Sequence, residues 1–355
     1  MAVGVTEIAK HVGLSKGTVS RYLNGDPTLK LKPETREKID SVRVKLGFNL
    51  NLTKQAGAKL AHNFVIPVNR LFQGSEALTT LSFSQMYKSM EQVLRRDNFR
   101  LSLVFFEELT KQETFRDLLS SPDFCDGILL LTGTADTELA KLILTNKTPH
   151  VSIEPQDEEL GLNTVVAHSL LGIRQAVRHL KNLGHTHFGF VGLKQFYRHI
   201  QFVSVLFENS LPLREEAQVY LSGKDPRSSE YQWREIAKKT FLKHIESQPL
   251  ATAYFCQNDL IAFGVIDALR EKGLEPGYDI SVLGYDNLEE RAADDDNILG
   301  LTTIDNPLDV IGKRCGQILL NQVFHRQTDI VHEHIPTRLI IRKTTGRCNM
   351  ERGNV

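Results

Sequence analysis

The chain has 355 residues, enough for two or three domains, and its apolar fraction of 41% and charged fraction of 24% are ordinary for a folded globular protein. It contains no apolar run of membrane-spanning length and no hydrophobic signal segment at its N-terminus, so we expect a cytoplasmic protein. Its four cysteines are widely scattered, without the close pairs of zinc or redox motifs, and we expect neither a metal nor a cofactor.

The first segment, residues 5–23, predicts two short helices joined by a tight turn. Apolar residues recur at helical spacing as far as Val12, and Thr6 supplies an oxygen near the start of the first helix. Gly13 can end that helix in the left-handed conformation, and Ser15 can cap the next one. The segment therefore predicts a helix-turn-helix.

The second of these helices has one apolar face and one polar face. Val19, Tyr22 and Leu23 can pack on the first helix. The outward face is slim and basic, and it consists of Lys16, Gly17, Ser20 and Arg21. Such a helix fits the major groove, where we expect the two cationic side chains to donate to guanine acceptors. The alternative is a surface helical hairpin with no DNA role.

Charge is distributed unevenly along the chain. Residues 1–61 hold eleven Lys and Arg against five Asp and Glu, a net charge of +6, whereas the rest of the chain holds 32 against 38. A basic head on a mildly acidic body is what a phosphate-binding head would produce, and this favours DNA binding over the alternative.

A third helix and a linker are expected next. Residues 32–35, with Pro33 in the first turn, predict the start of a helix that ends at Gly47. Residues 49–63 are polar and lack a clear apolar face, so alone they predict a linker. This linker can order as a helix when it is held against DNA.

From Phe64 onward, short apolar runs alternate with amphipathic helices. Strands are expected at 64–68, 101–106, 127–131, 150–153, 188–191, 219–221, 253–256 and 281–285. Helices are expected at 83–95, 112–119, up to Leu144, 170–183, near Phe202, 231–245 and 258–272. The pattern predicts an α/β core of two tandem doubly wound parallel-sheet lobes, preceded by a small all-α domain. A ligand would then bind between the lobes, beyond the carboxyl ends of the strands.

Several long motifs resemble the lactose-repressor type of bacterial transcription regulator, the LacI/GalR family, from about Val5 to Gly346. They are VTEIAKHVGLSKGTVSRYLNG, ETREKIDSVRVKLGFN, RHLKNLGHTHFGFVG, NDLIAFGVIDALREKGL, DISVLGYDN and LTTIDNPLDVIGK. The resemblance implies a periplasmic-binding-protein-like body and a homodimer that binds a near-palindromic operator in double-stranded DNA. It also implies that a small effector, a carbohydrate or derivative, changes operator affinity.

The expected organisation combines the pattern and the resemblance. Residues 1–48 would form the helix-turn-helix domain, 49–62 a hinge, 63–346 the effector-binding and dimerisation domain, and 347–355 a tail. Within the large domain, we expect an N-lobe of about 63–165 and 299–326 and a C-lobe of about 166–298 and 327–346.

The resemblance also assigns roles to individual residues. It places DNA contacts at Thr6, Ser15, Lys16, Gly17, Thr18, Ser20, Arg21, Asn24, Asn51, Lys54 and Gln55. It places effector contacts at Arg198, Asn258, Asp286 and His168. Arginine, amide and carboxylate groups together supply the donors and acceptors that a sugar-like ligand requires.

Simpler roles compete with the effector assignments. Asp286 can cap the turn after its strand, Asn258 can cap the following helix, and Arg198 can form a surface ion pair. For Asp259 we expect the capping role rather than a ligand contact.

Departures from the family pattern concern the hinge and the effector site. The positions of the usual Pro and of the Leu that wedges into the minor groove read Leu50 and Gly57, and a glycine cannot wedge. We therefore expect either a weaker hinge or one that uses Leu60 in a shifted helix. His168 and Ser169 replace a frequent Asp-Asn pair, so the identity of the effector cannot be inferred from that of any relative. The stretch between Val68 and Phe83 is longer than usual in the family.

Other functions are less consistent with the sequence. An enzyme on this scaffold would show a phosphate-binding glycine motif or a nucleophile elbow, and neither is present. A periplasmic solute-binding protein would have a signal peptide in place of the basic head. We therefore expect no enzyme but a regulator, most simply a repressor. An activator of the same family remains an alternative.

Overall fold

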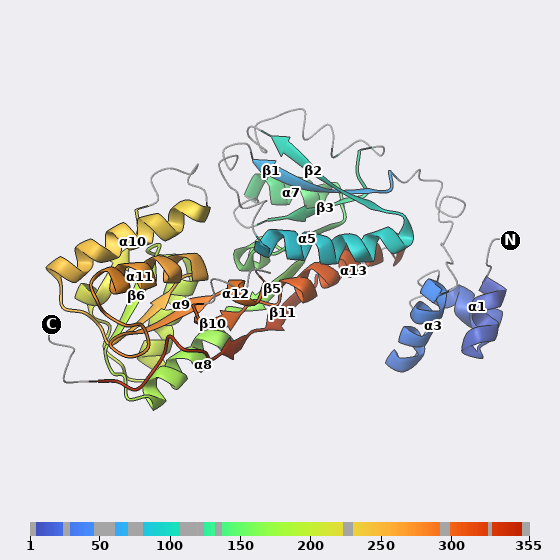
Figure 1. Ribbon diagram of the computed structural model, residues 1–355. Helices are drawn as coiled ribbons and strands as arrows, with labels where there is room; N and C mark the ends of the chain where they lie inside the picture. Colours follow the sequence, from blue (N-terminus) through green and yellow to red (C-terminus); the bar gives the residue numbers. More distant parts are fainter. Residues whose placement is uncertain are drawn as a thin grey trace. The chain divides into compact units, whose positions relative to one another are not determined.

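The computed structural model describes residues 5–23, 29–45, 61–69, 81–106, 119, 124–131, 137–222, 230–291, 299–325 and 329–349 (Figure 1). Several predictions concern residues outside these ranges. They are the contacts of Asn24, Asn51, Lys54 and Gln55, the hinge positions Leu50, Gly57 and Leu60, and most of the helix expected at 112–119.

The N-terminal head contains α1 (Val5–Val12), α2 (Lys16–Leu23) and α3 (Pro33–Lys45). Gly13 has φ +73°, and its N–H donates to the carbonyl of Ala9, so the glycine ends α1 as predicted. Ile8, Val19 and Ile39, one from each helix, are fully buried against one another. This shared apolar core fixes how the three helices pack.

The first sheet follows the head. Among the described residues its strands are β1 (Asn63–Asn69), β2 (Arg100–Phe106), β3 (Gly127–Leu130), β4 (His150–Ser152), β5 (Thr164–His168) and β11 (His332–Pro336), in the order β11-β5-β4-β3-β1-β2. The register is parallel between β1 and β2, β1 and β3, β3 and β4, and β4 and β5. The accompanying helices are α5 (Leu81–Leu94), α7 (Thr137–Thr145) and α13 (Leu308–His325), with short 3-10 turns at Arg95–Asp97 and Pro155–Glu158.

The second sheet repeats this design. Its described strands are β6 (Phe188–Gly192), β7 (Gln218–Tyr220), β8 (Ala253–Cys256), β9 (Ser281–Tyr285), β10 (Thr302–Asp305) and β12 (Arg338–Ile340), in the order β12-β10-β9-β8-β6-β7. The pairings are parallel except for β10 with β12, which is antiparallel, so the expectation of purely parallel sheets is corrected at this edge. The helices are α8 (Ser169–Asn182), α9 (Tyr197–Glu208), α10 (Glu230–Ser247), α11 (Asp259–Glu271) and α12 (Leu288–Arg291), with a 3-10 turn at Glu215–Ala217.

Helices cover both faces of the second sheet. Along β8, Tyr254 and Cys256 belong to the core that contains α10 and α11, whereas Ala253 and Phe255 belong to the core that contains α8 and α9. In Figure 1, α10 and α11 lie side by side on one side of this sheet and α8 lies on the other. This alternation explains why buried strands read as continuous apolar runs in the sequence.

The chain divides into two compact units. One unit contains residues 87–166 and 309–333 together with the head, and the other contains 167–308 and 334–355. The sequence-based range 299–326 was expected in the N-lobe, but β10 pairs with β9 in the second sheet. Conversely, β11 lies in the first sheet, although 327–346 was expected in the C-lobe. The boundaries between the two lobes depend on strand pairing between segments that are distant in the sequence. Hydrophobic periodicity does not reveal such pairing.

Candidate DNA-binding face and effector site

The hairpin of α1 and α2 is held by a local cap. Oγ of Ser15 accepts from the backbone N–H of Thr18 at 3.0 Å and lies 2.8 Å from the Thr18 hydroxyl. This is the cap that the sequence predicted, and it sets the start of α2 at Lys16.

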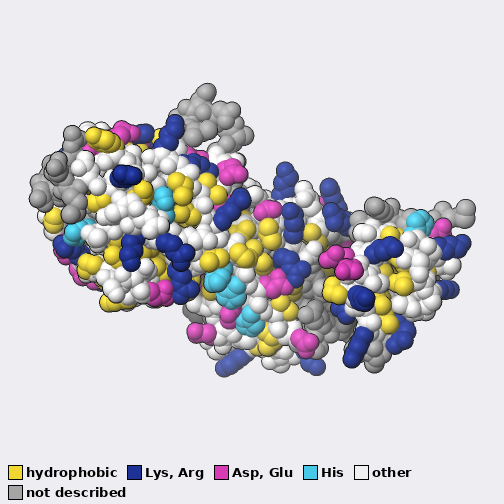
Figure 2. Space-filling model, turned by 90° about the horizontal axis from the view of Figure 1, so that it is seen from below, with side chains coloured by type: hydrophobic (Ala, Val, Ile, Leu, Met, Phe, Trp, Pro, Cys, Tyr) yellow, Lys and Arg dark blue, Asp and Glu magenta, His cyan; other side chains and the backbone are white. Residues whose placement is uncertain are grey.

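The two faces of α2 differ in burial. Val19 and Leu23 are 0% and 2% exposed, whereas Lys16, Gly17 and Arg21 are exposed. The hydroxyl of Tyr22 donates to Oδ2 of Asp40 at 2.8 Å and so ties α2 to α3. Lys and Arg side chains are prominent over α1–α3 on the face shown in Figure 2.

Four of the other residues predicted to contact DNA lie in the described part of the head. Thr6 is exposed at the start of α1, Ser15 is exposed in the turn, and Thr18 and Ser20 are half-buried. In the described part of the head, α2 therefore presents a narrow, basic surface to solvent, while its other face packs on the apolar core of the head.

A buried arginine organises the second candidate site. Arg198, the second residue of α9, is 9% exposed, and its Nη1 donates to the carbonyl of Gln257 at 2.9 Å. Its Nη2 lies 3.5 Å from Oδ1 of Asp286. The guanidinium carbon lies 3.7 Å from the centroid of the Tyr285 ring, a cation–π stack. Nε is buried without a hydrogen-bond partner among the described residues.

Asp286 directly follows β9 in an unusual backbone conformation. Its φ is 113°, and that of Asn287 is 56°. The side-chain amide of Asn306 donates to Oδ1 of Asp286 at 3.1 Å. Positive φ at successive non-glycine residues is costly, so the surrounding structure must hold this turn in place.

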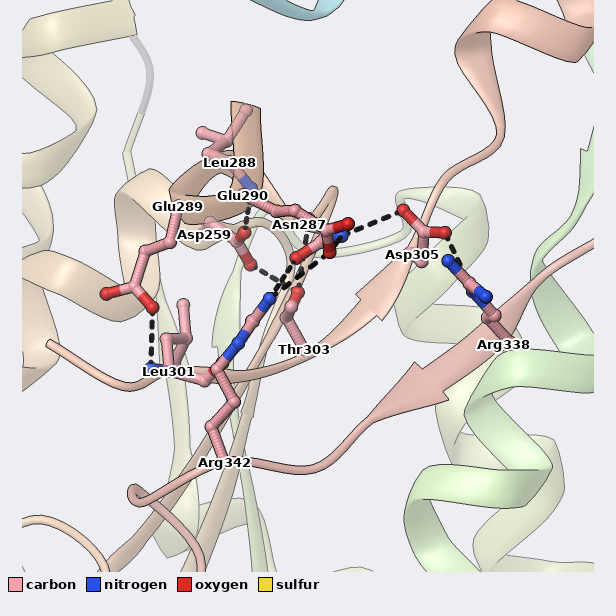
Figure 3. A network of polar contacts seen from close by, with 10 residues as sticks. All are labelled: Asp259, Asn287, Leu288, Glu289, Glu290, Leu301, Thr303, Asp305, Arg338 and Arg342. Atoms are coloured by element: carbon pink, nitrogen blue, oxygen red, sulfur yellow. Dashed lines mark hydrogen bonds and ion pairs between the residues drawn. The ribbon is translucent and has the colours of Figure 1, made fainter. Parts of the chain in front are cut away.

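Figure 3 shows the polar network that holds the turn. Nη2 of Arg342 donates to Oδ1 of Asn287 at 2.6 Å, and its Nη1 donates to the carbonyl of Leu301 at 2.8 Å. The Asn287 amide donates to Glu290 at 2.7 Å and to Asp305 at 3.0 Å. Asn287 is only 2% exposed, so these bonds satisfy a buried amide and fix the backbone beside Asp286.

Asp259 holds the other side of the same turn. Its side chain is fully buried and accepts from the Leu288 N–H at 2.7 Å and from the Thr303 hydroxyl at 2.6 Å. Burial, reinforced by the charge of Asp286, raises the pKa of the Asp259 carboxyl to about 7. The expectation that Asp259 is a helix cap is therefore wrong, because its oxygens are used by β10 and the β9–α12 turn.

Asn258 provides the cap instead. Its Oδ1 accepts from the Ile261 N–H at 2.9 Å at the start of α11. Adjacent polar residues before a helix both suit the capping position, which is why the sequence did not distinguish them. Asn258 follows Gln257, whose carbonyl binds Arg198, so it lies at the same edge of the sheet.

The structure brings Arg198 and Asp286 into direct contact but does not join His168 to them. The His168 carbonyl accepts from the Thr337 hydroxyl at 2.9 Å, and its ring lies edge-on to His334 at 5.8 Å. The neighbouring Ser169 is connected to the site, because its Oγ is 2.7 Å from the hydroxyl of Tyr285.

Sequence reasoning missed Tyr285, Gln257 and Asn306. The motif that suggested Asp286 also contains Tyr285, but only the packing of α9 on β9 puts the ring under a guanidinium. Trp233, on α10, is partly buried and packs against the core that α10 shares with α11, so it is a structural residue. Within the described ranges, no group of three or more His, Cys, Asp or Glu side chains is arranged to hold a metal ion. No helix in those ranges is both long and apolar enough to cross a bilayer.

Comparison with known proteins yields two matching family models. Residues 5–51 match the model described as bacterial regulatory proteins, lacI family. Residues 177–345 match a periplasmic binding protein-like domain. The first match covers the helical head, and the second covers all the described strands of the second sheet together with Arg198 and Asp286.

Relatives match over nearly the full length. The HTH-type transcriptional repressor MelR of Bacillus subtilis is 24% identical over 349 residues, which cover 97% of this chain and 98% of MelR. The solved complex of the transcriptional regulator CelR with cellobiose has a TM-score of 0.65 at 19% identity, and the match covers 96% of this chain and 99% of that chain. The lac repressor dimer bound to operator and the anti-inducer ONPF has a TM-score of 0.65 at 20% identity and covers 98% of this chain and 100% of that chain.

The solved structures establish a common fold, and the relatives match the chain over nearly its full length. A regulatory-protein head precedes a periplasmic-binding-protein-like body in one chain. The chain thus joins a head that matches the lacI family of bacterial regulatory proteins to a periplasmic-binding-protein-like body.

Proposed function

We propose that this protein is a transcriptional repressor that binds a near-palindromic operator as a homodimer and is controlled by a small polar effector. The face of α2 carries the proposal. It presents Lys16 and Arg21 to solvent, while Val19 and Leu23 anchor the helix to its support. Such a helix can insert into the major groove without unfolding the head.

The family and the charge of the head support a dimer on two half-sites. Two-fold symmetry in the protein requires two-fold symmetry in its site. We assign 1–48 to DNA binding, 49–62 to a hinge and 63–346 to effector binding and dimerisation. DNA contacts are proposed for Thr6, Ser15, Lys16, Gly17, Thr18, Ser20, Arg21, Asn24, Asn51, Lys54 and Gln55. The protein would act in the cytoplasm, where bacterial DNA lies.

Selection of bound duplexes from a random DNA pool by the purified chain, at two salt concentrations, tests this function. We expect a palindrome with two equal half-sites at both concentrations, because base contacts persist when phosphate contacts are screened. Binding that is sequence-blind and vanishes at the higher salt would contradict it.

The proposed effector site contains Arg198, Asn258 and Asp286, with His168 as a more distant candidate. The guanidinium donors of Arg198 lie beside the carboxylate acceptor of Asp286. Nε of Arg198 has no hydrogen-bond partner among the described residues, so it is a buried donor that can bind a ligand oxygen. The pair is close to neutral overall, so we infer a neutral polyhydroxyl ligand, which is sugar-like. The solved CelR–cellobiose complex and a solved LacI family regulator with bound ribose are consistent with this class.

A thermal-shift screen of neutral mono- and disaccharides against their uronates and phosphates tests the effector class. A ligand that binds the folded state raises the melting temperature by mass action. We expect the shift from a neutral saccharide. A shift confined to anionic compounds would contradict the neutral class.

An activator of the same family is the second candidate. Activation and repression use the same protein surfaces and differ in where the operator lies relative to the promoter. A reporter fused to the promoter nearest the selected site distinguishes them, because deletion of the gene raises expression only for a repressor.

A further inference from the structure

A cluster of exposed arginines lies on the body of the protein, outside the helical head. Arg95 and Arg96 belong to the 3-10 turn that follows α5, and Arg100 begins β2. The side chain of Arg95 is 74% exposed, and Arg96 and Arg100 are exposed as well. Residues 88–100 hold four Lys and Arg against two Asp and Glu, whereas the whole chain after residue 61 holds 32 against 38. These three residues, the α5–β2 arginines, therefore form a local basic surface on a mildly acidic body.

The α5–β2 arginines have few partners within the protein. Arg95 lies 3.6 Å from Glu91, and an exposed pair of this kind contributes little to stability. No hydrogen bond or ion pair joins the side chains of Arg96 and Arg100 to another described residue. A cation at the C-terminal end of a helix complements the helix dipole, but Arg100 lies outside the helix. The dipole therefore does not explain the whole cluster.

The cluster lies beside the point at which the linker joins the body. The N–H of Arg100 donates to the carbonyl of His62 at 2.9 Å, and Arg100 pairs with Asn63 in the parallel register of β1 and β2. The ring of Phe99 packs on that of His62, with the ring centroids 5.1 Å apart. In Figure 1, the end of α5 and the starts of β1 and β2 lie at the same end of the first sheet.

Hydrogen bonds hold the chain in place at this junction. Asp126 accepts from the N–H of Ala61 at 3.0 Å through Oδ1 and from the N–H of Asn63 at 2.9 Å through Oδ2. His62, between them, has a φ of 53°, a left-handed conformation that its surroundings must stabilise. The linker therefore joins the body at a fixed position, and Arg100 is bonded to that position.

We propose that the α5–β2 arginines form a second DNA-binding surface, which contacts phosphates of the duplex that the head of the same chain has bound. This inference rests on the proposed function. Because head and body are parts of one chain, contacts of the body with that duplex form intramolecularly, so weak contacts still add affinity. Guanidinium groups bind phosphate oxygens in a bidentate manner, and phosphate contacts carry no sequence information. The surface thus strengthens binding without changing the preferred sequence.

The test compares wild type with the triple variant Arg95→Ala, Arg96→Ala, Arg100→Ala in the full-length chain. The probes are the operator selected by wild type, with about ten base pairs of flanking sequence on each side, and a scrambled duplex of equal length. At about 0.1 M salt, affinity for both duplexes should fall about tenfold or more, because fewer counterions are released. The slope of log affinity against log salt should become shallower by about 2 or more, which corresponds to one lost contact in each protomer.

Two control variants separate phosphate binding from other roles. Replacement of all three arginines by lysine should preserve most of the affinity and the salt slope, because lysine binds phosphate as a point charge. Arg178→Ala, Lys181→Ala and Arg214→Ala together remove the same charge from exposed positions of the second unit. This variant should bind both duplexes within about twofold of wild type, because salt screens charges that do not touch the duplex.

The outcomes separate this inference from the proposed function. If wild type selects a palindrome and the triple alanine variant keeps wild-type affinities and salt slope, the second surface is overturned and the regulator function stands. A variant that loses affinity for the operator alone, or that no longer sediments as a dimer, also overturns it, because sequence reading or dimerisation is then what changed. If wild type selects no sequence, the proposed function fails, and this inference fails with it.

Discussion

The guanidinium of Arg198 stacks on the ring of Tyr285 at 3.7 Å, and the hydroxyl of Tyr285 is 2.7 Å from Oγ of Ser169. Tyr285 and Ser169 are 0% and 2% exposed, so the arginine rests on a ring that is itself fixed by a buried hydrogen bond. A rigid platform lowers the entropy lost when the arginine binds a ligand.

Tyr285→Phe keeps this ring but removes the hydroxyl. We expect the free energy of unfolding, measured in urea, to fall by about 1 to 2 kcal/mol, because Ser169 loses a buried partner. In the Tyr285→Phe background, Ser169→Ala should cost little more, since the bond is already lost. Fully additive losses would contradict a direct hydrogen bond between the two hydroxyls.

Arg198→Lys should impair the effector response. Lysine keeps the charge but lacks the planar fork and the stacking surface of arginine. Affinity for the saccharide that stabilises wild type should fall about tenfold or more, whereas operator affinity without saccharide is retained. Arg174→Lys is the matched control, because Arg174 forms a comparable bidentate pair with Glu208 on the exposed surface. Equal losses in both variants would exclude a specific role for Arg198.

Asp259 should make stability depend on pH. Its folded pKa of about 7 lies above the ordinary aspartate value, so the folded state binds a proton that the unfolded state has released. Its contribution to stability is therefore favourable at low pH and is lost as pH rises from about 4 to about 7.

Asp259→Asn removes this titration. The asparagine oxygen can still accept from Leu288, and its amide can donate to the Thr303 oxygen. Between pH 5 and pH 7 the variant should lose on the order of 2 kcal/mol less stability than wild type, measured by urea unfolding at both values. Parallel pH profiles would show that Asp259 does not titrate in this range.

Tyr22→Phe should loosen the packing of α2 on α3. The substitution removes the 2.8 Å hydrogen bond to Asp40 that joins α2 to α3. We expect the head to lose about 1 kcal/mol, seen as faster hydrogen exchange in α2 and α3. Tyr278→Phe, at an exposed tyrosine of the second unit, is the control. Unchanged exchange in the head would contradict a supporting role for the bond.

Local chemistry made the head predictable. The ends of α1 and α2 depend on Gly13 and Ser15, whose preferences act within a few residues, and the structure confirms both. The start of α3 at Pro33 follows from a proline in the first turn. The alternating strands and helices of the two sheets were predicted from the spacing of apolar residues, which is also a local signal.

The sequence analysis did not predict the elements that depend on distant partners in the chain. The sequence did not predict β5, β10, β11 or β12, and it did not predict α13. β11 and β12 are short, and each becomes a strand only by adding to a sheet edge formed far away in the chain. The proposed effector site was not predictable in full for the same reason, because Arg198 meets Asp286 and Tyr285 only after α9 and β9 have packed together.

The central claim is that the exposed face of α2 reads base pairs. Its most direct test measures the affinity of wild type and Arg21→Ala for the selected operator and for each of its single-base variants, at two salt concentrations. We predict that Arg21→Ala loses about tenfold discrimination at one symmetric pair of positions and keeps it elsewhere. A uniform loss at all positions, or an unchanged preference, would contradict base reading by this face.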